Sequence, residues 1–386
     1  MGSPVELKPF LVDVEQQAVD RIRERLARAH WASAPADDVD WVYGTDAAWL
    51  RGLVQYWISR YDWRAAEREL NRWPQYRAEV DGLEIHFYHV KGSSARSRPL
   101  LLTHGWPGSV LEFQGCIEQL AFPALHGGAE HEGFDLVIPS LPGYGFSGRP
   151  ARPMGPRAVA QVWRRLMVDV LGLREFVAQG GDWGAAVTSW LGIDHADVTR
   201  GIHLNMLPSW VFSPPEQPSA EEQAYHARVA KVRASELGYF AIQSTKPQTV
   251  ALALADSPLG FAAWVCEKFR SWGDTHGDID SRFSRDTLIT NLMLYLLNDA
   301  VGSSIWMYRG RAEESPMGAR IPRVEVPTGV ACFPAEFIPY PPRPVAERAY
   351  AIERWTPMSA GGHFAALEEP RAFSDELRAF CSQIGF

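Results

Sequence analysis

The chain has 386 residues, of which 46% are hydrophobic and 12% aromatic, and it carries a formal net charge of −8. No basic run offsets this charge, so we expect no nucleic-acid partner and no docking to anionic lipid, since both need a basic surface. No apolar stretch of membrane-spanning length (about 18 residues) and no N-terminal signal pattern occurs, which predicts a soluble protein without membrane contact. Oligomeric state cannot be read from the sequence.

The cysteines favour neither a disulfide framework nor a metal site. The four, widely spaced and without a CxxC pair, are Cys116, Cys266, Cys332 and Cys381. A chain of this length needs no disulfides, so a reducing cytoplasm is the expected compartment. His126 and His131 lie close enough to share a metal, but no third ligand is evident. We therefore expect no metal and no other cofactor.

Residues 1–80 are expected to form an N-terminal helical meander. Apolar residues recur at near-helical spacing over residues 14–30 and 46–61, and a third helix is predicted over residues 63–71. The many Trp and Tyr residues of this segment indicate that it packs against another part of the chain.

The pattern changes over residues 81–207, the first part of the predicted core. Two strands, at 76–80 and 83–90, flank Asp81-Gly82, which is a strong hairpin signal. Further strands are expected at 99–103, 134–139, 175–179 and 199–205, and helices at 156–171 and 184–194. Such alternation predicts an α/β fold with a mostly parallel, doubly wound sheet.

Residues 208–315 interrupt this alternation with a mostly helical block. The α/β pattern resumes over residues 316–386, with strands at 326–331 and 350–355 and a final helix at 370–382. A helical block inserted between two parts of one sheet is what a lid over an active site requires. We therefore predict a helical lid over residues 208–315 and the second part of the core over residues 316–386.

The strongest local motif is Gly-Gly-Asp-Trp-Gly at residues 180–184, between a predicted strand and a predicted helix. Small residues around a central acid are typical of the sharp elbow that lifts a nucleophile to the top of an α/β-hydrolase sheet. Asp182 is thus the candidate nucleophile. The alternative is that Asp182 only caps the following helix.

A second motif, His-Gly-Trp-Pro-Gly at residues 104–108, follows the strand at 99–103. In α/β-hydrolases this loop supplies one backbone amide of the oxyanion hole, and the residue after the nucleophile supplies the other. Trp106 and Trp183 are the candidate donors. Alone, the motif is also compatible with a plain turn. However, HGWP, GYGFS and GGDWG occur in this order, each directly after a predicted strand, and this order favours the hydrolase interpretation.

The C-terminal part contributes a candidate acid and a candidate base. Glu336 follows the strand at 326–331, and His363 lies in a Gly-rich loop after the strand at 350–355. The chain order nucleophile, acid, histidine is that of the α/β-hydrolases. A further motif, GYGFSG at residues 143–148, matches a dinucleotide-binding pattern, but prolines rather than a helix follow it, so we expect no nucleotide there.

Together these motifs resemble those of the microsomal-type epoxide hydrolases, a family that includes the juvenile-hormone hydrolases. The similarity covers nearly the whole chain, in WRAAERELNRWPQY, HGWPGS, PSLPGYGFS, GGDWG, STKPQT, DSPLG, VPTG and GGHFAALEEP. It implies an α/β-hydrolase fold and a covalent ester on Asp182, hydrolysed by water that His363 activates with Glu336. It also implies that two lid tyrosines, Tyr239 and Tyr308, hold the epoxide oxygen.

The activity implied by the resemblance is conversion of an epoxide to a vicinal diol, and the aromatic content favours an apolar or aromatic substrate. Membrane-bound members begin with an anchor helix that is not seen here, so a soluble, bacterial-style member is expected; a part in natural-product biosynthesis is left undecided. A haloalkane dehalogenase is the nearest alternative, since it uses the same Asp ester, but it needs a halide cradle rather than paired tyrosines. A catalytically silent binding module and a serine esterase are weaker alternatives, because the triad is complete and no G-x-S-x-G elbow occurs.

Overall fold

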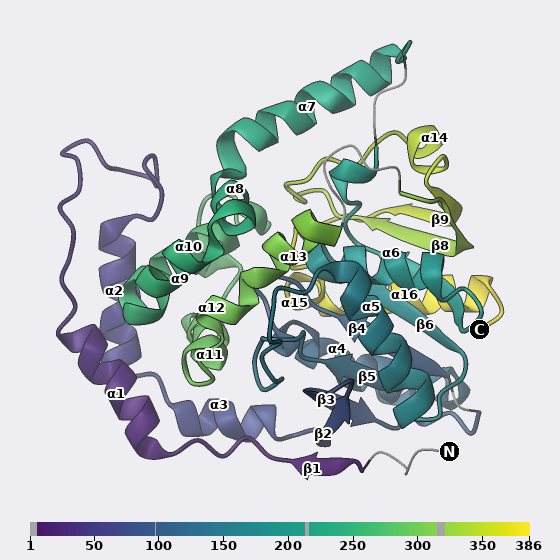
Figure 1. Ribbon diagram of the computed structural model, residues 1–386, viewed down its shortest axis with the longest axis horizontal. Coiled ribbons are helices and arrows are strands. Elements are labelled where there is room, and N and C mark those ends of the chain that lie inside the picture. Colours follow the sequence, from purple (N-terminus) through teal and green to yellow (C-terminus); the bar gives the residue numbers. More distant parts are fainter. Residues whose placement is uncertain (1–5, 97, 213–215, 315–320) are drawn as a thin grey trace.

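The computed structural model describes residues 6–96, 98–212, 216–314 and 321–386. Within them, a nine-stranded sheet runs in the order β1-β2-β3-β5-β4-β6-β7-β8-β9 (Figure 1). Pairing is antiparallel along β1-β2-β3-β5 and parallel from β5 onward, so the predicted mostly parallel sheet is confirmed. The strands are β1 (Lys8–Phe10), β2 (Gln75–Val80), β3 (Leu83–Val90), β4 (Pro99–Thr103), β5 (Asp135–Pro139), β6 (Phe176–Gly180), β7 (Thr199–Leu204), β8 (Val324–Cys332) and β9 (Tyr350–Pro357).

Helices cover both faces of the sheet, and each face has its own hydrophobic cluster. α5 (Pro156–Arg165) and α6 (Asp182–Asp194) belong to one cluster, whereas α4 (Gln114–Ala121) and α16 (Pro370–Gln383) belong to the other. Because both faces are covered, β4, β5 and β6 are buried along their whole length and are nearly continuous apolar runs. The sheet therefore provides a rigid base for the loops at its strand ends.

Helices α7 to α13 form the block inserted between β7 and β8, and they lie together beside the sheet (Figure 1). They are α7 (Ala220–Glu236), α8 (Gly238–Thr245), α9 (Pro247–Asp256), α10 (Pro258–Trp272), α11 (Arg285–Leu296), α12 (Ala300–Ser304) and α13 (Trp306–Glu314). Proline begins α9 and α10, because the first helical position needs no hydrogen-bonded N–H. In the described ranges no single helix is long and apolar enough to cross a membrane. Together α9 and α10 reach that length and hydrophobicity, but the pair is bent by 115°.

The N-terminal helices pack on these inserted helices. They are α1 (Gln16–Ala27), α2 (Ala47–Ser59) and α3 (Trp63–Leu70). The hydroxyl of Thr45 donates to the Ala263 carbonyl of α10 at 2.7 Å, and the hydroxyls of Tyr61 and Thr290 lie 2.9 Å apart. The N-terminal segment therefore contacts the inserted helices, and its strand β1 pairs with β2 at the edge of the sheet.

The observed elements differ from the predicted ones at particular boundaries. The predicted helix over residues 156–171 ends as an α-helix at Arg165 and continues as a π turn over Leu166–Val170. The first 80 residues contain β1 and β2 as well as helices, and residue 80 ends the first strand of the hairpin. We propose that the chain divides into a meander, two core parts and a lid, with β2 belonging to the core. The predicted junction at residues 315 and 316 lies outside the described residues.

Two short helices, α14 (Arg343–Ala346) and α15 (Ala365–Glu368), complete the C-terminal part of the core. α15 directly follows the Gly-rich loop at residues 361–364. The loops after β4, β6, β8 and β9 all emerge at the same edge of the sheet, because these strands are parallel. The residues predicted to be functional in the core lie on these four loops.

Candidate active site

Asp182 lies on a strained turn between β6 and α6. Its φ is +48°, a left-handed conformation that costs a non-glycine residue of order 1–3 kcal/mol. The neighbouring glycines allow the turn to close: a Cβ on Gly180 would lie 2.1 Å from the Gly184 carbonyl oxygen, and one on Gly184 would lie 1.9 Å from that of Thr103. Side chains are excluded at both positions, so the turn presents the Asp182 carboxylate at the strand ends.

The loop after β4 brings a backbone amide to this carboxylate. The Trp106 N–H donates to Oδ1 of Asp182 at 2.9 Å. A Cβ on Gly105 would lie 2.3 Å from the same oxygen, so the close approach requires glycine there. The Trp183 amide makes no hydrogen bond to Asp182 in the described part of the chain; it lies in the first turn of α6, where N–H groups have no helical partner.

His104 holds this loop and does not act on the nucleophile directly. Its Nδ1 lies 3.0 Å from the Gly105 carbonyl oxygen, and its Nε2 accepts from the Leu141 amide at 3.2 Å. Burial lowers the pKa of His104 to about 4, against opposing effects of Gly105 and Asp182. The ring is therefore neutral at physiological pH, with a donor on Nδ1.

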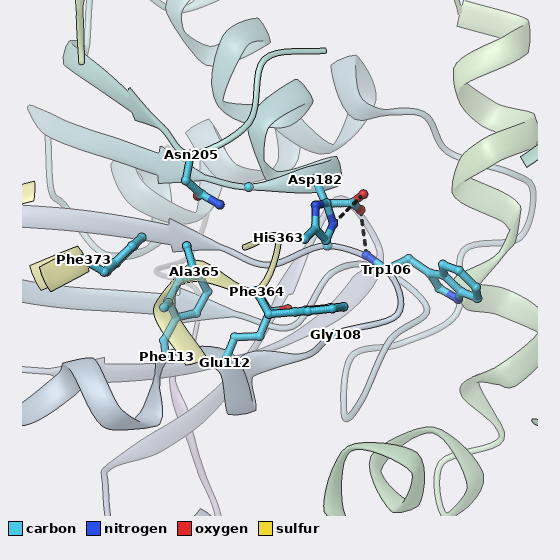
Figure 2. Close-up of a pocket in the computed structure, with 13 residues that line it drawn as sticks. Trp106, Gly108, Glu112, Phe113, Asp182, Asn205, His363, Phe364, Ala365 and Phe373 are labelled. Atoms are coloured by element: carbon cyan, nitrogen blue, oxygen red, sulfur yellow. Dashed lines mark hydrogen bonds and ion pairs between the residues drawn. The ribbon is translucent and has the colours of Figure 1, made fainter. Parts of the chain in front are cut away.

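The structure brings the predicted acid and base together at the nucleophile, and Figure 2 shows His363 beside Asp182. Nδ1 of His363 lies 3.0 and 2.9 Å from the two carboxylate oxygens of Glu336, and its Nε2 lies 3.4 Å from Oδ2 of Asp182. The side chains of Glu336 and His363 are 0% and 2% exposed, whereas that of Asp182 is 17% exposed. Of the three, Asp182 is thus the group most open to an incoming molecule.

The charge of His363 depends on its two carboxylate neighbours. Burial lowers its pKa, but the charges and hydrogen bonds of Glu336 and Asp182 together raise it, with a net result well above the ordinary value. His363 is therefore protonated when both carboxylates are charged. Neutralising Asp182 removes one of the two charges that keep the proton on the ring.

A buried carboxylate that the sequence did not indicate holds the loop carrying His363. Glu368 accepts from the amides on both sides of His363, Gly362 at 3.0 Å and Phe364 at 2.9 Å, and from the Asp274 amide at 2.7 Å. Burial raises the pKa of Glu368 to about 7, against the opposing effect of these amides. Two of these contacts are local, four and six residues along the chain, whereas the third joins the loop to Asp274, which lies 94 residues away.

The two lid tyrosines lie on α8 and α13 and pack on the tryptophans next to the nucleophile. The Tyr239 ring stacks on Trp106 with centroids 5.3 Å apart, and the Tyr308 ring meets Trp183 edge-on at 4.7 Å. Burial, then the charge of Asp182, raises the pKa of Tyr239 well above its ordinary value; for Tyr308 burial comes first, followed by Tyr239 and Asp182. Both hydroxyls therefore keep their protons.

The remaining motifs lie elsewhere. The GYGFSG turn at residues 143–148 contacts the lid, since the Ser303 hydroxyl donates to the Gly143 carbonyl at 2.6 Å. His126 lies 3.1 Å from a carboxylate oxygen of Glu118 on the surface. In the described residues, no group of three or more His, Cys, Asp or Glu side chains could hold a metal ion.

Comparisons with known proteins agree with this geometry. Residues 7–113 match the family model "Epoxide hydrolase N terminus", and residues 98–248 match "alpha/beta hydrolase fold". A Stigmatella aurantiaca protein provisionally named an epoxide hydrolase is 42% identical over 98% of this chain and 85% of its own. Epoxide hydrolase 1 of Sus scrofa is 32% identical over 97% and 88%, respectively.

Two solved structures are similar over nearly their whole length. The juvenile hormone epoxide hydrolase of Bombyx mori has a TM-score of 0.87 at 29% identity, over 99% of this chain and 95% of that one. The Aspergillus niger epoxide hydrolase also has a TM-score of 0.87, at 31% identity over 99% and 97% of the two chains. The chain has the α/β-hydrolase fold and belongs to the epoxide hydrolase family.

Proposed function

We propose that this enzyme converts an epoxide to a vicinal diol through a covalent ester on Asp182. The observation that carries the proposal is the set of groups around one carboxylate: the Trp106 amide on Oδ1 and Nε2 of His363 facing Oδ2. An epoxide carbon is a strained, saturated electrophile. A carboxylate is already charged at neutral pH, whereas a Ser hydroxyl would need a base to attack it.

In the first step, an oxygen of Asp182 attacks a ring carbon and the C–O bond of the epoxide breaks. A hydroxyl of Tyr239 or Tyr308, protonated beforehand because burial raises its pKa, donates a proton to the departing alkoxide. His363 gives up its own proton to restore the tyrosine. The ester carries no charge on Asp182, so the His363 imidazole loses one of the two charges that kept it protonated. Neutral His363 can then act as a base.

In the second step, neutral His363 accepts a proton from water, and the water oxygen attacks the ester carbonyl carbon. The amides of Trp106 and Trp183 stabilise the oxyanion; losing one such donor typically costs about 10²–10³ in rate. The bond between the acyl carbon and the diol oxygen breaks, the diol leaves protonated, and the remaining proton returns to His363. Glu336 holds the imidazole orientation throughout.

The tyrosines favour an epoxide over the halide of a haloalkane dehalogenase. An alkoxide must be protonated as it leaves, and a tyrosine hydroxyl can supply the proton, whereas a halide needs only neutral hydrogen-bond donors. We further propose an apolar or aromatic substrate, because the rings of Trp106, Trp183 and Phe240 all pack against the Tyr308 ring. A reducing compartment such as the cytoplasm is consistent with four free cysteines.

The test is a single turnover of styrene oxide with enzyme in excess, in ¹⁸O-labelled water. We expect unlabelled diol and one labelled oxygen in the Asp182 carboxylate, because water attacks the acyl carbon. His363→Gln is expected to gain the mass of the substrate, and Asp182→Asn is expected not to. Diol that carries the solvent label in the first turnover excludes the ester route, and bromoalkane cleavage at a comparable rate favours the dehalogenase.

A further inference from the structure

A small cavity lies beside Asp182 and His363 (Figure 2), and neither lid tyrosine is among the residues that line it. All of its lining residues belong to the core, and its polar ones are Glu112, Asp182, Asn205 and His363. The indole of Trp106 instead extends toward the lid, where it meets Tyr239 and Tyr308. The acid-base pair therefore has two sides, an aromatic side under the lid and a polar side within the core.

The cavity has the size of a water site and not of a substrate site. The space it leaves for the centre of a water molecule is about 10 Å³. One buried water needs roughly 10–15 Å³ of such space and two to four polar partners. The cavity meets the second requirement and approaches the first, whereas an aryl or alkyl epoxide is far too large for it.

Glu112 is, with Asn205, one of two polar residues here that the triad does not use, and it is the one with a carboxyl group. Its Oε1 fills the space that a side chain at position 108 would need, because a Cβ on Gly108 would lie 1.6 Å from that oxygen. Burial raises the pKa of Glu112 to about 8, against the opposing effects of His363 and the Gly105 and Ser109 amides. At neutral pH most of this carboxyl is protonated, so it can both donate and accept a hydrogen bond.

We propose that this cavity holds the water that hydrolyses the Asp182 ester, and that Glu112 orients that water toward His363. The inference rests on the proposed function and adds a water-positioning residue to it. The water oxygen attacks the acyl carbon from the core side and gives its proton to His363. Glu112 makes a hydrogen bond to the water and exchanges no net proton over the cycle. The first half-reaction, ester formation, does not need Glu112.

The test separates the two half-reactions by rapid-quench mass spectrometry of the protein. Glu112→Leu removes the hydrogen bond at similar volume, and we expect ester hydrolysis to slow by about 10²-fold, the usual effect of a misplacement near 1 Å. Ester formation should change only a few-fold, so the ester accumulates. Glu112→Gln, which can still donate and accept, should restore most of the rate. Glu118→Gln, a half-exposed carboxyl on α4 paired with Arg72, is the matched control and should behave as wild type.

A second variant covers the case in which Glu112→Leu does not fold. Gly108→Ala leaves Glu112 in the chain but pushes its carboxyl aside, and it should slow hydrolysis in the same selective way. Unchanged hydrolysis in both variants, or equal slowing of both half-reactions, overturns the proposal. Absence of any ester in His363→Gln instead contradicts the ester mechanism itself, so the two failures are distinguishable.

Discussion

The triad and the lid tyrosines differ in how they are held. His363 and Glu336 share two close contacts, Asp182 receives the Trp106 amide, and Glu368 holds the loop around His363. The lid tyrosines are held by the packing of their rings, Tyr239 on Trp106 and Tyr308 on Trp183. The charged groups are thus fixed by hydrogen bonds on the sheet, whereas the lid hydroxyls are placed by the rings that carry them.

This difference predicts that the two half-reactions respond to different parts of the molecule. Ester formation needs both the Asp182 carboxylate and a lid hydroxyl, but ester hydrolysis uses only groups of the core. Substitutions in the lid should therefore change the choice of epoxide and the rate of alkylation, and leave hydrolysis intact. The backbone amides of the core are already oriented before the reaction, so they stabilise the developing charge without having to move.

The largest effect is expected from Asp182→Asn. The amide is a poor nucleophile at a carbon centre, so turnover should fall by roughly 10⁴–10⁶, in the range seen for removal of a nucleophile. Turnover of styrene oxide and intact-protein mass measure this. The control is Asp194→Asn at the far end of α6, where the carboxylate pairs with Arg157 on the surface. If Asp182→Asn retains activity within tenfold of wild type, another group is the nucleophile.

Glu336→Gln comes next, because it acts on the base. Hydrolysis of the ester should slow by roughly 10²–10⁴, as for other losses of the group that orients a catalytic histidine. Glu336 raises the pKa of His363, so its loss should lower that pKa and move the rise of hydrolysis rate to lower pH. Single-turnover rates between about pH 6 and 10 test the direction, and a shift to higher pH contradicts it.

Tyr239→Phe and Tyr308→Phe should affect only the other half-reaction. Each removes one donor to the alkoxide, and we expect alkylation to slow by about 10²-fold, with a larger loss in the double variant. The rate of ester hydrolysis should stay within a few-fold of wild type. Tyr225→Phe is the control, since the ring of this buried lid tyrosine packs against Phe212, whereas Trp106 packs against Tyr239 and Tyr308. Equal slowing of both steps would show that the lid and the triad are not separable.

The smallest effect is expected from Glu368→Gln, which weakens the support of the His363 loop. Loss of one or two buried amide contacts should cost about 1–3 kcal/mol of unfolding free energy. The folded pKa of Glu368, about 7, exceeds the unfolded value, so its contribution is full below about pH 4.5 and declines as pH rises through 7. The stability difference between wild type and variant should therefore shrink from pH 5.5 to pH 8.5 in urea unfolding; a growing difference contradicts this sign.

Much of the site could be predicted because each of its core parts carries a local signature. Gly180 and Gly184 are required within one turn, so the elbow and its Asp182 are visible in five consecutive residues. The nucleophile, acid and histidine meet because each follows a strand of the parallel part of the sheet, where the loops emerge at one edge. The lid tyrosines lack such a signature, and they were predicted only through the family resemblance.

Residue patterns were enough to predict the alternation of strands and helices and the elbow at residues 180–184, because both depend on periodicity and short-range sterics, and the motifs were enough to predict the family. Tertiary packing, in contrast, places Glu112 beside His363, joins Glu368 to the distant Asp274 amide, and makes Lys8–Phe10 a strand. A three-residue strand is too short to show a period, and its pairing depends on β2, about 65 residues away. Contacts of this kind depend on how distant segments pack, and residue spacing carries no record of that.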